Sequence, residues 1–108
     1  LADLAERVCH EVSPDISVYR GRVVSGDQFV ADREVKERIT RQFHGFCTEM
    51  EGAAIAQASY LNQIPFVIIR AISDKADDSA SEDYPVFEKK AAQHCIRLVE
   101  GLMERLPA

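Results

Sequence analysis

The chain of 108 residues has no tryptophan, no long apolar run and only three cysteines. Cys9, Cys47 and Cys95 are odd in number and widely spaced, without a CxxC or cysteine–histidine spacing, so neither a disulfide framework nor a zinc site is indicated. Unpaired cysteines favour a reducing compartment, and we expect a cytoplasmic protein. The longest apolar run, residues 64–69, is too short to span a bilayer, so no membrane partner is expected.

Positive charge is outnumbered, with 13 lysines and arginines against 18 aspartates and glutamates. The net charge is −5 and the isoelectric point is near 5.1, which disfavours binding to nucleic-acid phosphates. The chain has no glycine-rich phosphate loop and no nucleophile elbow. Its three histidines are scattered, without partners at metal-ligand spacing, and no metal site is expected. The first residues lack the charged and apolar regions of a signal peptide.

The composition that remains is that of a folded globular chain, with 46% hydrophobic and 29% charged residues. The length allows one small domain over residues 1–108. The chain starts in the middle of a helical pattern and without methionine. Such a start is expected of a fragment, and processing of a longer chain would give the same start.

Apolar spacing and cap residues predict four helices. The first covers residues 1–11, and the second covers residues 33–43, begins after the N-cap Asp32 and ends at His44-Gly45, with glycine in the C-terminal role. The third, residues 52–61, is rich in alanine and closes at Asn62 and Pro65. The fourth is long and covers residues 86–106.

Three strands are predicted between these helices. Residues 16–25 are rich in β-formers, residues 46–48 form a short apolar piece, and residues 65–73 are almost continuously apolar, which is typical of a strand buried on both faces of a parallel sheet. The alternation of helices and strands indicates an α/β fold with a mostly parallel sheet. So few strands would leave a long unpaired edge, which indicates that part of the sheet lies elsewhere.

Acidic residues gather at the expected strand ends. Glu49-Met50-Glu51 precedes a helix of small residues, where the helix dipole favours negative charge. A carboxylate there could accept hydrogen bonds from the two hydroxyls of a ribose, and the methionine would offer an apolar surface. The alternative is a helix-capping acid beside a core methionine.

Asp74 directly follows the apolar segment 65–73. Ligands of open α/β sheets bind beyond the carboxyl ends of the strands, and partial desolvation there lets a carboxyl hold a proton that it can donate to a leaving group. The alternative is a loop or helix cap. Arg70, within the same segment, needs a carboxylate partner if it is buried, and Glu51 or Glu49 is the candidate.

Phe29 and Val30 follow another expected strand. A phenyl ring in this position could stack on a flat base while the backbone of Val30 reads the base edge. The alternative is a core phenylalanine.

Three motifs together resemble the 5′-methylthioadenosine/S-adenosylhomocysteine nucleosidases, which belong to the wider nucleoside phosphorylase and hydrolase family. They are SGDQFV (25–30), TEMEGAAIAQ (48–57) and PFVIIRAISDKAD (65–77). The resemblance covers residues 16–106. It implies a three-layer αβα fold with a mixed, mostly parallel sheet, of which this chain would hold only part.

The resemblance also implies roles at the purine. Phe29 would stack on the base and Val30 would contact it through its backbone. Asp74 would donate a proton toward N7 of adenine, with Ser73 helping to orient it. An acid beside the purine favours a 6-aminopurine such as adenine.

On the ribose side, the resemblance implies that Met50 packs against the sugar and that Glu51 accepts its hydroxyls. Arg70 would position Glu51 and the water side of the site. The substrate would be a purine thionucleoside of methionine salvage, and no metal or organic cofactor is implied.

The family's preceding half supplies a further glutamate that activates water, together with a glycine-rich segment, and nothing in this chain matches either. We therefore expect a half-site that is inactive alone and a homodimer in the complete enzyme. The alternatives are an aminodeoxyfutalosine nucleosidase, a purine nucleoside phosphorylase of the same fold, an adenine-binding fragment without activity, or a small α/β protein without a site.

Overall fold

A computed structural model of the chain describes residues 1–72 and 84–107. The chain divides into two compact units, one of Leu1–Tyr19 with Asp83–Ala108 and one of Arg20–Glu82. Each unit is described by itself below, and the single domain expected over residues 1–108 stays a prediction. None of the helices in the described ranges combines the length and apolar character that crossing a bilayer requires.

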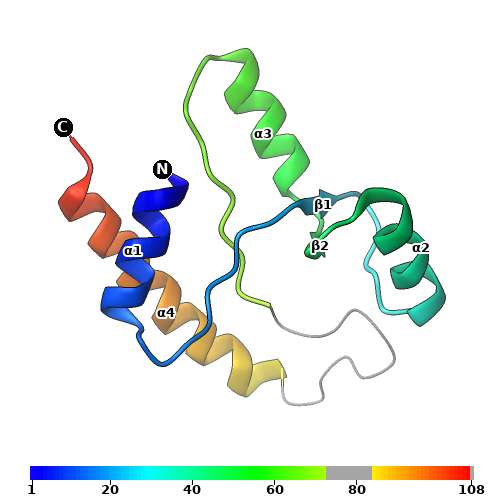
Figure 1. The fold of residues 1–108 in the computed structure, drawn as a ribbon, viewed down its shortest axis with the longest axis horizontal. Coiled ribbons are helices and arrows are strands. Elements are labelled where there is room, and N and C mark those ends of the chain that lie inside the picture. The colour runs from blue at the N-terminus through cyan, green and yellow to red at the C-terminus, as the bar shows by residue number, and fades with distance from the viewer. Residues whose placement is uncertain (73–83, 108) are drawn as a thin grey trace. The chain divides into compact units, whose positions relative to one another are not determined.

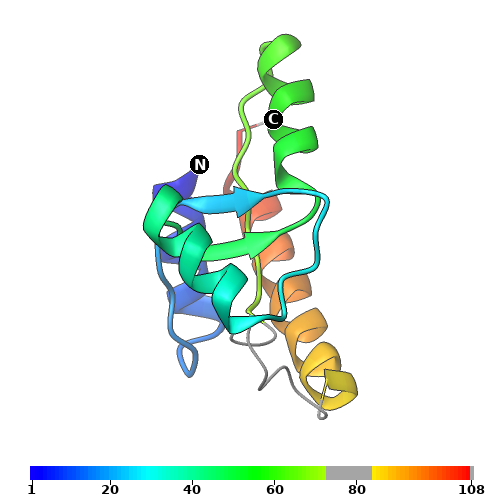
Figure 2. The same cartoon turned by 90° about the vertical axis from the view of Figure 1, so that its right-hand side faces the viewer.

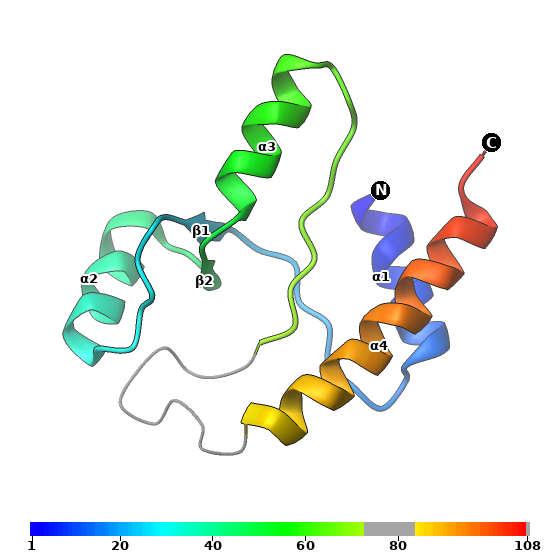
Figure 3. The same ribbon diagram turned by 180° about the vertical axis from the view of Figure 1, so that it is seen from behind.

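The first unit is a pair of helices, α1 (Ala2–Val12) and α4 (Tyr84–Arg105), which lie against one another (Figures 1 and 3). Helix α1 buries Ala5, Val8 and Cys9, which share one face because they are spaced three and four residues apart. Val8 and Cys9 pack on Leu98 of α4 to form the core of the unit. Both predicted helices are confirmed, within two residues at each end.

A glycine in the middle of α4 lets the two helices approach closely. A Cβ atom added to Gly101 would lie 2.5 Å from Cγ1 of Val8, which is closer than van der Waals contact allows. Just beyond α1, the buried hydroxyl of Ser13 is 2.8 Å from Nδ1 of His94. Glu11 and Arg105 also form an ion pair between the helices. This side of α1 is therefore joined to α4 by apolar and polar contacts.

The second unit contains a parallel pair of strands, β1 (Val23–Ser25) and β2 (Cys47–Glu49), whose arrows run in the same direction in Figure 2. The register pairs Val23 with Cys47 and Ser25 with Glu49. The expectation of a strand over 16–25 is wrong before residue 23. A β-former becomes a strand only where a partner lies beside it, and β2 offers three residues.

Helix α2 (Arg33–Phe43) connects the two strands, with the bounds expected from the sequence. Its N-cap prediction is confirmed, because Oδ1 of Asp32 accepts the N–H of Glu34 at 2.9 Å. The end of the helix corrects the prediction: His44, with φ 52°, adopts the left-handed conformation expected of Gly45. Arg22, ahead of β1, donates to the carbonyl of Phe43 at 2.6 Å and so ties β1 to the end of α2.

Helix α3 (Gly52–Leu61) follows β2 after two residues and rises from its end in Figures 1 and 3. Among its residues only Gly52 is buried. The helix closes at Asn62, whose side-chain amide donates to the carbonyl of Ala58 at 2.7 Å. The predicted helix and its end are both confirmed.

The strand predicted over 65–73 is wrong for residues 65–72, and residue 73 lies outside the described residues. Residues 64–72 return from the far end of α3 without strand pairing (Figure 1). Phe66, Ile69 and Ile72 are exposed rather than buried. An apolar segment of this kind needs neighbouring strands, and the only described strands are the pair β1–β2.

The described core is accordingly small. Five apolar residues among the described ranges are buried: Ala5, Val8, Cys9, Val30 and Leu98. Large apolar side chains of α3 and of the segment after it, such as Ile55, Leu61 and Ile64, face solvent. The α/β class and the parallel pairing are as predicted, and the sheet is incomplete.

Candidate active site

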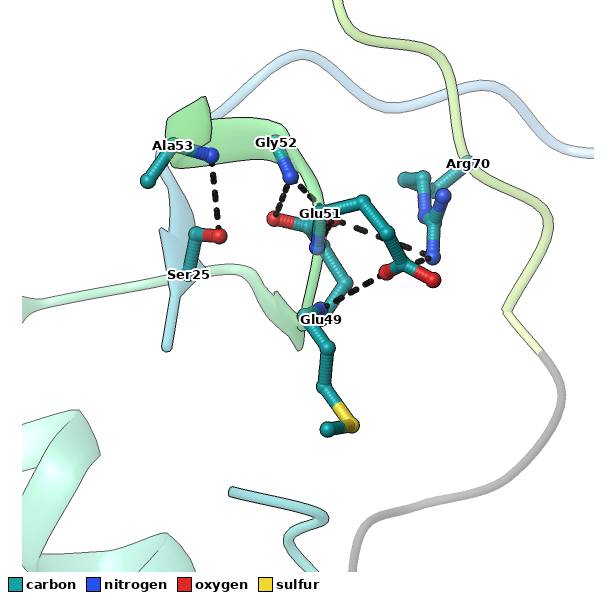
Figure 4. A network of polar contacts seen from close by, with 7 residues as sticks. Ser25, Glu49, Glu51, Gly52, Ala53 and Arg70 are labelled. Atoms are coloured by element: carbon teal, nitrogen blue, oxygen red, sulfur yellow. Dashed lines mark hydrogen bonds and ion pairs between the residues drawn. The ribbon is translucent and has the colours of Figure 1, made fainter. Parts of the chain in front are cut away.

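The carboxyl ends of β1 and β2 meet the start of α3, and polar side chains gather there (Figure 4). Because the strands are parallel and Ser25 pairs with Glu49, the last residue of each strand lies beside that of the other. Two residues after β2, α3 begins and presents its first N–H groups to the same place. The topology thus brings Ser25, Glu49 and the start of α3 together, at the edge of a parallel sheet where ligands bind.

Glu49 turns its carboxylate inward onto the start of α3. Its side chain is only 4% exposed, and Oε2 accepts the N–H of Glu51 at 2.9 Å. The N–H of Gly52 donates to both oxygens, at 2.9 Å to Oε1 and 2.7 Å to Oε2. The next N–H, that of Ala53, donates to the hydroxyl of Ser25 at 2.9 Å. Glu49 and Ser25 therefore cap the helix, the alternative foreseen for this acidic pair.

These contacts set the charge of Glu49. Burial by itself would raise the pKa of its carboxyl. The hydrogen bonds from the Glu51 N–H, the Ser25 hydroxyl and the Gly52 N–H, together with the positive charge of Arg70, act in the opposite direction and hold the pKa below its ordinary value of 4.5. Glu49 is thus a buried anion, stabilised where the helix dipole also favours negative charge.

Glu51 lies differently, although only one residue separates it from Glu49. Its side chain is 62% exposed and makes no cap contact with α3. Oε2 accepts the N–H of Met50 at 3.1 Å and a hydrogen bond from Nη2 of Arg70 at 3.3 Å. No hydrogen bond to Oε1 is found among the described residues, so this oxygen can accept from a ligand.

The expectation that Arg70 has a carboxylate partner is confirmed, and it has two such partners. Its Nη2 is 3.3 Å from Oε2 of Glu51 and 3.8 Å from Oε2 of Glu49. The guanidinium reaches them from residues 64–72, as Figure 4 shows. Its side chain is 38% exposed and lies in no strand, so the prediction of a buried strand arginine is wrong. The group has donors left for a ligand.

Met50 completes the ribose-side set. It is 43% exposed, which excludes the core methionine considered as the alternative. Its thioether is therefore available as an apolar surface next to Glu51. An exposed carboxylate, an arginine and an apolar side chain suit a small polyol such as a sugar ring, because hydroxyls donate to the carboxylate while the ring carbons pack on the thioether.

The two residues expected at the purine differ in solvent exposure. Phe29 is 67% exposed, which excludes the core phenylalanine and leaves its ring free to stack. Val30 is 7% exposed and lines an open hollow of about 380 Å³ between β1 and α2, together with Ile39 and Phe43. Among the described residues, no hydrogen bond or ion pair joins Phe29 or Val30 to Glu51, so the purine side stays a prediction.

Ser73 and Asp74, the residues expected to protonate the leaving group, lie outside the described residues. Within residues 1–72 and 84–107, no three side chains of histidine, cysteine, aspartate or glutamate gather closely enough to hold a metal ion.

Two contributors to the site were not singled out from the sequence. Ser25 opens the SGDQFV motif, yet its role follows from the pairing of β1 with β2, which no local pattern predicts. Gly52 has a steric role, because a Cβ there would lie 2.5 Å from Oε1 of Glu49. The glycine directly after Glu49-Met50-Glu51 was a signal for this close approach.

Comparison with known proteins assigns the family. Residues 1–104 match the family described as the phosphorylase superfamily. The 5′-methylthioadenosine/S-adenosylhomocysteine nucleosidase of Treponema pallidum is 46% identical over 90 residues, which cover 82% of this chain and 34% of the relative.

Two solved structures from Helicobacter pylori share the fold with a TM-score of 0.84. They are a futalosine hydrolase, 33% identical, and a 5′-methylthioadenosine/S-adenosylhomocysteine nucleosidase in complex with a pyrrolidinol that carries an aminopyrrolopyrimidine and a propynylthiomethyl group, 31% identical. Each match covers 97% of this chain and 44% of the other. The chain thus spans less than half the length of these relatives, and it belongs to the phosphorylase superfamily.

Proposed function

We propose that this chain supplies the ribose- and purine-binding half-site of a nucleosidase that hydrolyses the N-glycosidic bond of 5′-methylthioadenosine and S-adenosylhomocysteine and releases adenine, a reaction of methionine salvage. The observation that carries the proposal is the Glu51 carboxylate. It is exposed, oriented by the N–H of Met50 and by Arg70, and open at Oε1. The name of the relative at 46% identity supports the choice of substrate.

The proposed reaction breaks the bond between C1′ of the ribose and N9 of the purine. The bonding electrons leave with the purine, positive charge develops on the ribose, and the oxygen of a water molecule bonds to C1′. Glu51 accepts the ribose hydroxyls and favours the developing positive charge. Asp74, oriented by Ser73, donates a proton to N7 and so neutralises the purine. General-acid help of this kind contributes about 10²- to 10⁴-fold.

The remaining roles of the proposal come from the resemblance to the nucleosidases. Phe29 stacks on the base, the backbone of Val30 reads its edge, and Met50 packs on the sugar. The group that takes the proton from water is expected from the part of the fold that this chain does not contain. We also propose that the enzyme needs no cofactor and acts in the cytoplasm. We further propose that it is a homodimer, and sedimentation of the complete enzyme tests this oligomeric state.

A chimera tests the proposal. In it, the matched 44% of the Helicobacter pylori nucleosidase is replaced by this chain, and adenine release from 5′-methylthioadenosine is measured. We expect adenine release by the chimera and none above background by the 108-residue chain alone. A folded chimera that releases no adenine, beside an active parent enzyme, would refute the proposal.

Asp74→Asn in the chimera tests the proton donor. The amide keeps the size of the side chain but cannot supply the proton, so the rate should fall by about 10²- to 10⁴-fold. The circular dichroism spectrum and the midpoint of urea unfolding should stay unchanged. An undiminished rate would mean that another group protonates the purine.

A futalosine-type substrate is the second candidate, favoured by the futalosine hydrolase neighbour with a TM-score of 0.84. The ratio of kcat/KM for aminodeoxyfutalosine and 5′-methylthioadenosine in the chimera separates the two. A phosphorylase of the same fold would instead need phosphate and form a ribose 1-phosphate. If the chain is only an adenine-binding fragment, calorimetry will detect adenine binding while every chimera stays inactive.

A further inference from the structure

Glu49 is a second carboxylate close to Glu51, but its side chain is buried instead of facing solvent. Glu49 is 8% exposed as a residue, and its side chain is 4% exposed, against 62% for the side chain of Glu51. Nothing in the proposed chemistry uses a buried carboxylate at this position. Burying a charged carboxylate costs free energy, so the contacts of Glu49 must account for its position.

The first consequence of Glu49 concerns the backbone that carries Glu51. The N–H of Glu51 and the N–H of Gly52 both donate to the Glu49 carboxylate, at 2.9 Å or less. Two successive peptide groups around the Cα atom of Glu51 are therefore held by one side chain. This fixes the direction in which the Glu51 side chain leaves the turn between β2 and α3, as Figure 4 shows.

The second consequence concerns Arg70. It comes from residues 64–72, which have no strand pairing to hold them in place. Its guanidinium is 3.8 Å from Glu49 and 3.3 Å from Glu51. A flexible side chain with one exposed partner gains little from that pair, whereas a second, buried carboxylate restricts the orientation of the guanidinium.

Two further contacts show that this turn is built around the buried carboxylate. Ser25 is paired with Glu49 in the sheet register, and its hydroxyl accepts the N–H of Ala53, the next N–H of α3 after the one that donates to Glu49. Gly52 leaves the space that the carboxylate occupies, because a Cβ would come within 2.5 Å of Oε1. The strand register places Ser25 beside Glu49, and the glycine leaves room for the Glu49 carboxylate.

We propose that Glu49 is a positioning residue, which holds the Glu51 backbone and the Arg70 guanidinium and thereby sets the Glu51 carboxylate for the ribose hydroxyls. The catalytic part of this role rests on the function proposed above. Glu49 acts through its two neighbours and does not touch the substrate.

A double-mutant cycle in the chimera distinguishes positioning from a general loss of stability. Glu49→Gln keeps the shape of the side chain but replaces one accepting oxygen with an NH₂ group that cannot accept the N–H groups of the turn. We expect kcat/KM for 5′-methylthioadenosine to fall by about 10²-fold, the loss that a misplacement of about 1 Å can cause. In a Glu51→Gln background, the same substitution should cost about 2-fold or less, because residues that act through one another are not additive.

Glu37→Gln is the matched control. It removes an exposed carboxylate from α2, in the same unit, and should leave kcat/KM unchanged in both backgrounds. Equal losses from Glu49→Gln with and without Glu51 would mean that the two residues act independently, and would overturn the proposal.

A measurement without catalysis keeps the inference decidable if the chimera is inactive. In the 108-residue chain, nuclear magnetic resonance should show the side-chain N–H signal of Arg70 and the amide signal of Gly52 moving with one midpoint as Glu49 is titrated. In Glu49→Gln, the Arg70 side chain should become more mobile and the Gly52 amide should exchange faster. An Arg70 signal that is unchanged in the variant would overturn the positioning role, whereas an inactive but folded chimera counts only against the proposed function.

Discussion

Arg70 donates a hydrogen bond to Oε2 of Glu51 across 3.3 Å, although the two residues are 19 positions apart in the sequence. The pair joins the start of α3 to the segment that follows the same helix. Glu49, 3.8 Å from the same guanidinium, is turned into the protein instead. Two carboxylates that look equivalent in the sequence thus have different tasks, one toward the helix and one toward solvent.

Arg70→Lys in the chimera should weaken substrate binding. A lysine ammonium is a compact charge on a flexible stem and cannot keep the planar donor geometry that arginine offers to two carboxylates. We expect KM for 5′-methylthioadenosine to rise and kcat/KM to fall by about 10- to 10²-fold, measured by steady-state adenine release. Arg38→Lys, on the exposed side of α2, is the control and should have no effect. Equal KM values for the two variants would contradict the role of Arg70.

Gly52→Ala should destabilise the chain. The new methyl group would lie 2.5 Å from Oε1 of Glu49, so the carboxylate must leave its place on α3. Overpacking of this kind costs about 1–3 kcal/mol, which exceeds the gain of about 0.5–1 kcal/mol from replacing glycine in a helix. Urea unfolding followed by circular dichroism measures the difference.

Gly26→Ala is the matched control for this substitution, because nothing lies within 4 Å of a Cβ placed at Gly26. It should be neutral or stabilising by less than about 1 kcal/mol. If both variants unfold at the same urea concentration, the close packing of Gly52 on Glu49 is wrong.

The charge of Glu49 predicts how stability depends on pH. Its pKa is lower in the folded chain than the ordinary value of 4.5, so between these two values the unfolded chain binds more protons than the folded one. The stabilisation is therefore complete above pH 4.5 and is lost as the pH falls through the lowered pKa. Urea unfolding at a series of pH values from 7 to 3 should show a smaller decline for Glu49→Gln than for the wild type. A decline of the same size in Glu37→Gln and Glu49→Gln would assign the effect to net charge instead.

The helices were predictable because their signals are local. Asp32 caps α2 through a hydrogen bond to a residue two positions away, and Asn62 closes α3 by one to Ala58. The sequence did not show which residue ends α2 in the left-handed conformation. His44 adopts it, although the neighbouring Gly45 could do so at a lower cost in free energy.

The strands were less predictable because a strand depends on its partner. The apolar run 65–73 has the composition of a central strand, yet the described residues offer it no neighbour. The chain covers 44% of the related nucleosidase, and the small core and exposed apolar residues are those expected of part of a larger fold.

The order of elements in the sequence predicted that Glu49 and Glu51 lie between the end of a strand and the start of a helix, and the structure confirms this placement. Their part in ligand binding stays a prediction. Which of the two caps the helix depends on the sheet register that brings Ser25 beside Glu49, and on the space left by Gly52. The register joins residues that are far apart in the sequence, which a pattern along the chain does not contain, whereas Gly52 is a local signal that becomes clear only beside the Glu49 carboxylate.

The packing of α1 on α4 gives a last prediction, independent of the site. Gly101→Ala should place a methyl group 2.5 Å from Cγ1 of the fully buried Val8, at a cost of about 1–3 kcal/mol that outweighs the helix-forming gain of alanine. Val8→Ala alone should also destabilise, because it leaves a cavity in the same place. In the double variant the new methyl group occupies the space that Val8 vacated, so urea unfolding should show a loss smaller than the sum of the two by about 1 kcal/mol. Strictly additive losses would mean that Gly101 and Val8 do not touch.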